Sequence, residues 1–290
     1  QYGLPISIYH SMLQALAARP LEAGIGMQSY TSFRREQQQR RVAVYLNPEV
    51  NTIQPPKTIA TSQTARALPS LEKMVWHYKV NSVENHPFFQ RLHREPANLT
   101  NLWLLFANFQ EGIVAHFTRR LALVVAYIND DRIRCVLAKQ LNEELGNGDV
   151  SHIHQIMFDR FISGLEPHQP ELITTEMLAP GAKLSQSLEA LYSDPNPYTG
   201  VGAAILMEIR GEQRDEIVNQ ELARTTLDSS VSSWFYLHGE LEADHADEVM
   251  NLARQIDNSD GDKAAVLQGL ERTSDVLWDF CNGMYRVCFM

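Results

Sequence analysis

The sequence is poor in cysteine, and its three cysteines are scattered at Cys135, Cys281 and Cys288. No two of them form a C-x-x-C pair, so neither a disulfide framework nor a cysteine-rich zinc site is indicated. Such sparse cysteine fits a reducing cytoplasm. The sequence also lacks an apolar run of the roughly 18 residues that span a bilayer, and no signal peptide is visible. We therefore expect a cytoplasmic protein that has no membrane partner.

Basic residues are in the minority. The chain has 25 Lys and Arg against 35 Asp and Glu, which gives a net charge of −10 at pH 7. A protein that binds nucleic acid needs a basic face, so we expect no nucleic-acid partner. Hydrophobic residues make up 44% of the 290, which is enough to bury the core of one large domain or two small ones.

Residues 1–70 differ in composition from the rest of the chain. The polar run from Arg34 to Arg41 indicates a solvated segment, and residues 51–70 carry three prolines among many Thr and Ser. A stretch rich in Pro, Thr and Ser, such as residues 51–70, is typical of an extended linker. We therefore divide the chain into an N-terminal arm with a Pro-rich linker, residues 1–70, and a helical-bundle metal-binding domain, residues 71–290. The arm is expected to pack on the bundle or on a neighbouring subunit.

From Leu71 onward the apolar residues recur with the period of an α-helix almost throughout. Asn98 and Asp130 stand where helix N-caps are expected, whereas Pro180 and Gly181 mark a loop. The sequence predicts an all-α fold, with about seven helices around one core. The expected helical stretches are 71–82, 86–92, 98–127, 130–141, 153–162, 184–192, 200–209 with its continuation 212–224, 229–258 and 263–285.

The most informative stretch lies between Trp234 and Glu248. His238, Glu242 and His245 occupy positions i, i+4 and i+7, which share one stripe of a helix with 3.6 residues per turn. Two imidazoles and a carboxylate on one stripe can hold a first-row metal ion. Apolar neighbours indicate that the stripe faces a core. The simpler interpretation places the three side chains on the surface, in water.

Two further carboxylates occur where a core is expected. Glu208 follows six apolar or small residues, and Glu111 lies in a strongly apolar helical stretch. A carboxylate buried without a partner is very costly, so Glu208 needs a cation. That cation is either Arg210 or Arg214 in a salt bridge, or a metal ion. We favour a ligand role for Glu111, while His116, five residues later, falls on a different face and either supports a ligand or lies on the surface.

Another stretch contains Glu144 and His154, ten residues apart. Ten helical steps leave these side chains about 80° out of line, so a regular helix does not place them on one stripe. The glycines between them permit a distortion that brings both to one centre. In the alternative, the glycines join two helices and the acidic side chains lie on the surface. Glu143 competes with Glu144 for the same role, and His152 competes with His154.

Together these residues form a set of donors rich in carboxylate oxygen. Such a set, built inside a helical bundle, suits a pair of iron or manganese ions, whereas zinc usually takes fewer carboxylates. Four carboxylates also neutralise two divalent cations. The predicted metal ligands are Glu111, Glu144, His154, Glu208, His238, Glu242 and His245.

The order of these residues resembles that of the haem-oxygenase-like diiron oxidases and oxygenases, also called iron-containing redox enzymes. That family has a Glu on an early helix, a Glu and His pair, a lone Glu, and then a His-x-x-x-Asp-x-x-His element. Here the lone Glu208 precedes His238 by thirty residues. The resemblance covers about Leu71 to Tyr285, and the ordered set is more specific than any one motif. The sequence departs from the family at Glu242, where Asp is usual. The longer side chain of Glu alters the geometry in which the carboxylate coordinates the metal.

The resemblance implies a haem-oxygenase-like bundle with an N-terminal extension, two Fe ions with Mn as the alternative metal, and O2 as co-substrate. The implied activity is that of a non-haem diiron oxidase or oxygenase. Such an O2-dependent oxidoreductase oxidises or cleaves a small carboxylate-bearing substrate derived from an amino acid or a fatty acid. We also expect an external electron donor and a homodimer. No basic residue can be assigned from the sequence to hold the substrate carboxylate.

Two other functions fit parts of the pattern. A metal-free member of the same fold, such as a thiaminase-like hydrolase, needs a buried nucleophilic cysteine beside a carboxylate. Cys135 lies among apolar helical residues, so we expect it to pack in the core rather than to react. The other function is that of a helical protein-interaction module with a vestigial metal site, which would use its acidic surface and N-terminal arm. Metal analysis separates these functions from the oxidase.

Overall fold

The computed structural model describes residues 70–81, 85–227, 235, 247–258 and 262–290. The chain divides into two compact units, Gln1–Val50 and Asn51–Met290, and all described residues belong to the second. The predicted arm and linker, residues 1–70, lie outside the described residues except for Ser70. So do three of the predicted metal ligands, His238, Glu242 and His245, which remain predictions.

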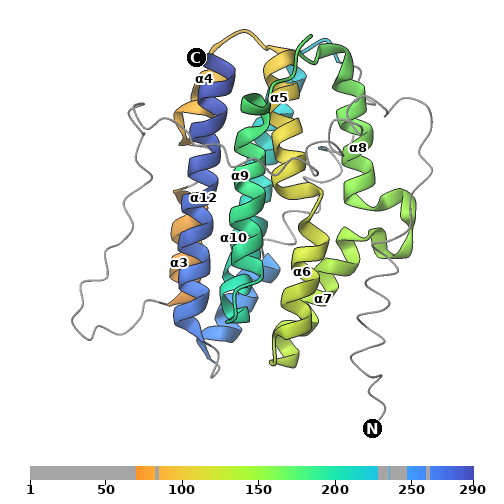
Figure 1. The fold of residues 1–290 in the computed structure, drawn as a ribbon. Helices are drawn as coiled ribbons and strands as arrows, with labels where there is room; N and C mark the ends of the chain where they lie inside the picture. Colours follow the sequence, from red (N-terminus) through yellow and green to blue (C-terminus); the bar gives the residue numbers. More distant parts are fainter. Residues whose placement is uncertain (1–69, 82–84, 228–234, 236–246, 259–261) are drawn as a thin grey trace. The chain divides into compact units, whose positions relative to one another are not determined.

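The described residues confirm the all-α class, because they form helices joined by short turns and contain no strand (Figure 1). The α-helices are α3 (Leu71–Val80), α4 (Pro87–Arg94), α5 (Leu99–Phe109), α6 (Phe117–Tyr127), α7 (Asp131–Glu144), α8 (His154–Leu165), α9 (Thr175–Tyr192), α10 (Pro197–Ala223) and α12 (Lys263–Phe289). Shorter helical turns are η2 (Gln110–Val114), η3 (Gly146–Gly148), η4 (Val150–His152) and η5 (Glu166–His168). Residues 247–257 are helical as well.

The predicted helix starts are confirmed by their caps. The side chain of Asn98 accepts a hydrogen bond from the N–H of Asn101 at 3.1 Å, and Asp130 accepts one from the N–H of Arg132 at 2.9 Å. Each bond satisfies one of the backbone donors that a helix leaves unpaired at its N-terminus. These caps set where α5 and α7 begin, and hence which side chains each helix turns inward.

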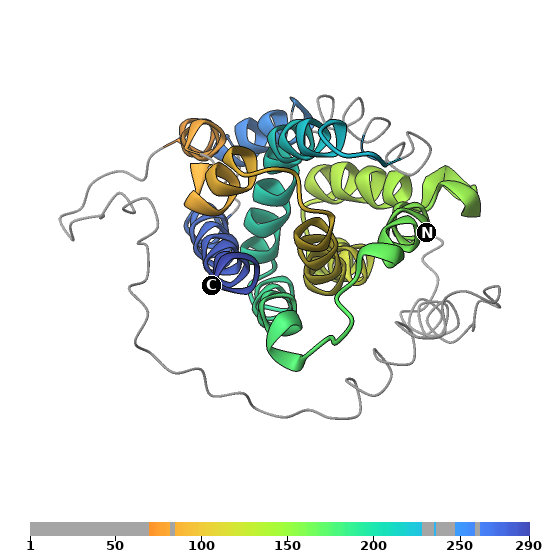
Figure 2. The ribbon, with the colours of Figure 1, turned by 90° about the horizontal axis from the view of Figure 1, so that it is seen from above.

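The core lies where α9 runs between α12 on one side and the succession of α5 and α6 on the other (Figures 1 and 2). Aromatic rings fill its α8 end. The ring of Phe106 lies 4.8 Å from that of Phe161 and 5.3 Å from that of Phe235, measured between centroids. All three side chains are almost fully buried. Burying each stabilises the fold by roughly 1.5–3 kcal/mol.

The single helix expected over residues 98–127 is wrong, because a π-helix divides it. After α5, the segment η2 adopts i to i+5 hydrogen bonding, with the Ala115 N–H donating to the Gln110 carbonyl at 3.0 Å. The buried guanidinium of Arg120 supports this segment by donating to the Gly112 carbonyl at 2.8 Å. Short π segments inside α-helices occur frequently at functional sites. This one carries Glu111.

The expected loop at Pro180 and Gly181 is also wrong, since both residues lie inside α9. A proline in a helix removes a backbone donor and normally breaks the helix. Asn108 of α5 repairs the break, because its Nδ2 donates to the Met177 carbonyl and its Oδ1 accepts from the Gly181 N–H, each at 2.8 Å. In a regular helix these two backbone groups would bond to each other. The approach requires glycine, since a Cβ on Gly181 would lie 2.5 Å from the Asn108 carbonyl oxygen.

A pair of glycines lets α10 and α12 pack backbone against backbone. A Cβ added to Gly202 would lie 2.1 Å from the Val266 carbonyl oxygen, and one added to Gly269 would lie 2.1 Å from the Thr199 carbonyl oxygen. Neither carbonyl can move without moving its helix. The contact therefore sets the separation of the helix that carries Glu208 from its neighbour.

Gly202→Ala is expected to lower the free energy of unfolding by about 2 kcal/mol or more, because the methyl group must push two helices apart. Where a helix has room, the same change raises stability by up to about 1 kcal/mol. The sign of the change is therefore diagnostic. Urea unfolding followed by circular dichroism measures it, with the exposed position Gln186→Ala on α9 as the control. A more stable Gly202→Ala protein would contradict the close packing.

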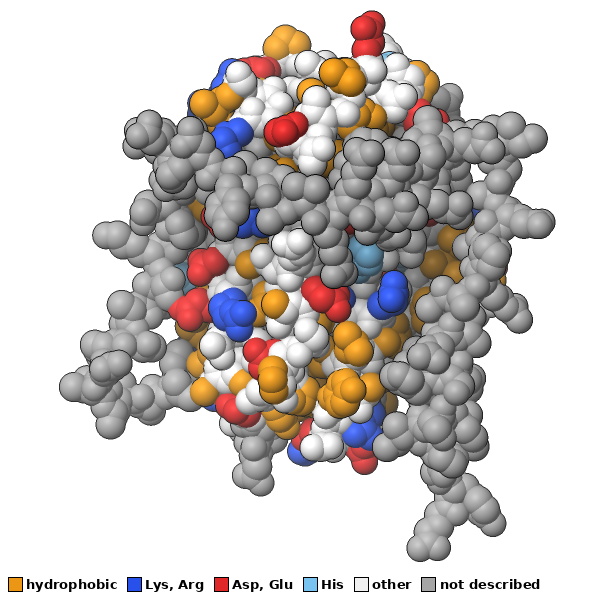
Figure 3. Space-filling model, viewed as in Figure 1, with side chains coloured by type: hydrophobic (Ala, Val, Ile, Leu, Met, Phe, Trp, Pro, Cys, Tyr) orange, Lys and Arg blue, Asp and Glu red, His pale blue; other side chains and the backbone are white. Residues whose placement is uncertain are grey.

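The surface of the described residues mixes charges of both signs. On the face drawn in Figure 3, acidic and basic side chains lie among apolar ones rather than gathering by sign. Some form ion pairs, such as Lys183 with Asp279 at 3.0 Å. No helix among the described residues is long and apolar enough to cross a membrane.

Candidate metal centre

The structure brings Glu144 and His154 together. Glu144 ends α7 and His154 begins α8, and the turn between them contains three successive residues at positive φ, with Gly146 at 74° and Gly148 at 89°. Glycine adopts this conformation without steric cost. The Nδ1 of His154 lies 3.0 Å from the Oε2 of Glu144, and each side chain is only 10% exposed. The glycines do join two helices, but Glu144 is buried at the junction rather than on the surface.

The two competing residues face elsewhere. The side chain of His152 is 69% exposed, and its Nδ1 lies 3.3 Å from the Oδ2 of Asp149. The Oε1 of Glu143 lies 3.5 Å from the Nζ of Lys139. These contacts favour Glu144 and His154 as the pair that belongs to an interior site.

Glu208 joins this pair from a third helix. Its side chain on α10 is almost fully buried, and it lines the same cavity as Glu144 and His154. The cavity measures about 510 Å³ including its mouth, and most of its other lining residues are apolar. Arg214 forms a salt bridge with Asp215, at 2.7 Å from Nε to Oδ1. The structure therefore gives the guanidinium of Arg214 a carboxylate other than Glu208.

Glu111 lies on η2, at the edge of this region. The expectation that His116 falls on a different face is wrong, because the wider π turn brings its Nε2 to 4.0 Å from the Oε1 of Glu111. The side chain of Glu111 is 32% exposed. Ile113 and Val114 of the same segment line the cavity, but Glu111 is not among the lining residues. Its ligand role stays a prediction.

Tyr192 is a neighbour of the site that the sequence analysis missed. Its side chain, at the end of α9, is almost fully buried, and its phenol oxygen has no hydrogen-bond partner among the residues that the structure describes. Burial raises the pKa of the phenol far above its usual range, and the charges of Glu208 and Glu144 raise it further, against the opposing effect of Arg120. The phenol is therefore neutral. In the sequence, an aromatic residue at a helix end cannot be told from an ordinary core residue.

Tyr192→Phe is expected to leave the metal-free protein as stable as before, or more stable by up to about 1 kcal/mol, because a buried hydroxyl without a partner is costly. Guanidinium chloride unfolding of the metal-free protein measures the change. Tyr78→Phe, at another buried tyrosine, serves as the comparison. A loss of more than about 1 kcal/mol in Tyr192→Phe would show that the hydroxyl makes a stabilising bond.

The described part of the predicted site fits iron in the chemistry of its donors. Two carboxylates and an imidazole from three helices line one cavity, and such donors bind iron inside helical bundles. Among the residues that the structure describes, no group of three or more His, Cys, Asp or Glu side chains could hold a metal ion by itself. The predicted stripe of His238, Glu242 and His245 lies outside them, so the complete ligand set stays a prediction.

The position of Cys135 differs from the one that we expected. We expected it to pack in the core, but it is exposed, because α7 turns Ile133 and Leu137 inward and Cys135 outward. The buried cysteine is Cys281, on α12. An exposed thiol on α7 is not the buried nucleophile that a thiaminase-like hydrolase requires.

Comparison with known proteins agrees with this chemistry. A family model described as iron-containing redox enzyme matches residues 107–278, which is more than half of the chain. The search of curated proteins found no match to the chain. The matched range spans all seven predicted ligands, from Glu111 to His245. The chain thus belongs to the iron-containing redox enzymes, the family that the order of its Glu and His residues resembles.

Proposed function

We propose that the protein is a non-haem diiron oxidase or oxygenase that uses O2 to oxidise or cleave a small carboxylate-bearing substrate. One observation carries the proposal. Glu144, His154 and Glu208, from three different helices, line one cavity in a chain of an iron-containing redox family. Buried carboxylates need cations, and iron is the cation that this family contains.

In this proposal seven side chains hold two Fe ions, with Mn as the alternative metal. Four of these side chains are carboxylates, whose charges balance two divalent cations. When bound, the iron pair supplies the redox chemistry that activates O2. The proposed ligands are Glu111, Glu144, His154, Glu208, His238, Glu242 and His245.

The chain's own residues orient the donors and exclude water. The Nδ1 of His154 lies 3.0 Å from the Oε2 of Glu144, which leaves Nε2 as the ring nitrogen that could ligate a metal ion. Phe109, Ile113 and Met207 form apolar walls of the cavity. Apolar walls exclude water and so limit side reactions of an activated oxygen species.

The reaction with O2 tests the proposal. Protein loaded with ferrous iron without oxygen, then mixed with O2 in a stopped-flow instrument, is expected to consume O2 and show a transient visible absorption. A panel of amino and fatty acids is expected to contain compounds that speed the reaction. Protein loaded with zinc, which has no redox chemistry, is the control. A protein that holds ferrous iron and stays unreacted with O2 for minutes, with the whole panel present, would favour an interaction module instead.

A further inference from the structure

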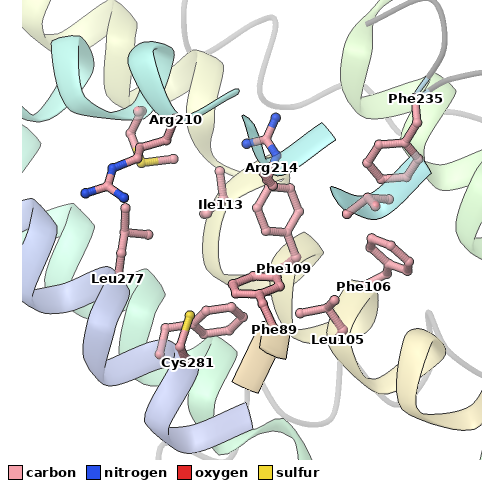
Figure 4. A pocket seen from close by; sticks show the side chains of 13 residues that line it. Phe89, Leu105, Phe106, Phe109, Ile113, Arg210, Arg214, Phe235, Leu277 and Cys281 are labelled. Carbon is pink, nitrogen blue, oxygen red and sulfur yellow. The ribbon is translucent and has the colours of Figure 1, made fainter. Parts of the chain in front are cut away.

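A second cavity, here called the apolar cavity, adjoins the candidate metal centre. It measures about 610 Å³ including its mouth, and residues of α4, α5, η2, α10 and α12 line it together with Phe235. Apart from Arg210 and Arg214, every described lining residue is apolar. Figure 4 shows both guanidinium groups beside the aromatic rings and aliphatic chains of the cavity. A cavity of this composition suits the hydrocarbon part of a ligand.

The apolar cavity and the cavity of the metal centre share part of their walls. Four residues line both of them, namely Phe109, Ile113, Met207 and Arg214. A ligand that fills the apolar cavity therefore has one end next to the cavity of the candidate metal centre. Among the described residues, Arg214 is the one cation that lines both.

The surroundings of Arg214 orient its guanidinium. The group lies over the ring of Phe109, 5.1 Å from the centroid (Figure 4). Its Nε donates to the buried carboxylate of Asp215 at 2.7 Å. A guanidinium carries its N–H donors in a flat fork, which matches the geometry of a carboxylate. No residue could be assigned to this task from the sequence alone.

We propose that the apolar cavity binds the hydrocarbon body of a singly charged carboxylate, and that Arg214 holds the carboxylate where the two cavities meet. This inference rests on the proposed function and narrows its substrate class to alkyl or aryl carboxylates rather than amino acids. An amino acid would also bring an ammonium group, which is costly to bury unpaired. No described residue that lines the apolar cavity is a carboxylate. The carboxylates of the adjoining cavity are assigned to the metal.

The test is calorimetric binding to the full-length protein under nitrogen, so that no turnover occurs. The matched pair of probes is 3-phenylpropanoate and phenylalanine, which differ by the ammonium group. We expect 3-phenylpropanoate to bind at least about tenfold more tightly. We also expect decanoate to bind more tightly than hexanoate, by up to about fourfold per added methylene that the cavity buries. Equal or tighter binding of phenylalanine, or no binding of either probe, would overturn the proposal.

The variants separate an anion site from an ordinary salt bridge. Arg214→Gln alone would leave Asp215 buried without its partner, so the informative protein combines Arg214→Gln with Asp215→Asn. It should bind 3-phenylpropanoate at least about tenfold more weakly and neutral 3-phenylpropanol unchanged. Lys183→Gln, at an exposed lysine, is the control for lost charge. Unchanged binding of 3-phenylpropanoate to the double variant would overturn the proposal.

A second variant tests binding in the apolar cavity even if the double variant does not fold. Val218 lines the apolar cavity and not the metal cavity, so Val218→Phe fills only the former. It should weaken decanoate binding several-fold more than hexanoate binding, and an unchanged ratio would overturn the proposal. None of these measurements involves O2. Failure of the oxidase activity alone therefore leaves the binding result intact, and loss of binding leaves the iron chemistry to be judged separately.

Discussion

Glu208→Gln is expected to reduce the iron retained by the protein from about two ions per chain to fewer than one. The substitution keeps the size of the side chain and removes its negative charge, so the metal loses an anionic ligand. The metal-free protein is not expected to lose stability, since the substitution removes a negative charge from an almost fully buried position, where a charge is costly. Iron content falls while the apo fold is preserved.

Metal analysis together with thermal unfolding of the metal-free protein measures both effects. Glu171→Gln, at an exposed residue before α9, is the matched control and should change neither quantity. The opposite result is equally clear. Strong destabilisation of the metal-free protein with unchanged iron would identify Glu208 as a salt-bridge partner of an arginine on α10 rather than a ligand.

Arg120→Met is expected to lower the free energy of unfolding by about 3 kcal/mol or more. The guanidinium is almost fully buried and donates to the carbonyl oxygens of Gly112 and Ser185, each at 2.8 Å. It also lies 3.3 Å from Glu189. Methionine fills much of the same space but donates nothing, so both carbonyls lose a bond that water cannot easily replace.

Urea unfolding checks this value, with the exposed neighbour Arg119→Met as the control, which should change stability by less than about 0.5 kcal/mol. Hydrogen exchange adds a local measurement, because the amides of η2 should exchange faster once Arg120 no longer supports the segment. A change of less than about 1 kcal/mol in Arg120→Met would mean that the π segment holds its shape without this side chain.

The helices that the sequence predicts well are those whose stability is local. Periodicity and capping residues place the start of α5 at Asn98 and of α7 at Asp130, because each cap acts within three residues of itself. The π segment and the proline in α9 are different. Asn108 bonds to a carbonyl 69 residues away, and Arg120 to one 65 residues away. No local pattern contains those partners, so the sequence predicted an unbroken helix in one place and a loop in the other.

The candidate site likewise combines features that local sequence predicts with features that depend on distant contacts. The burial of Glu208 could be predicted because its apolar neighbours surround it on all sides of the helix. The approach of Glu144 to His154 could be anticipated because glycines stand between them. The place of Arg214 could not, since it depends on which side chains of α5 and α12 face α10. Cys135 was misplaced for a similar reason, because apolar neighbours do not reveal which way a side chain points.

The most direct test of the central claim is the iron content of the full-length protein. Protein produced with added iron, purified without oxygen and analysed for metal, is expected to contain about two irons per chain. Manganese in the same amount after growth with manganese would fit the same ligands. Folded protein that retains neither metal would contradict the diiron assignment.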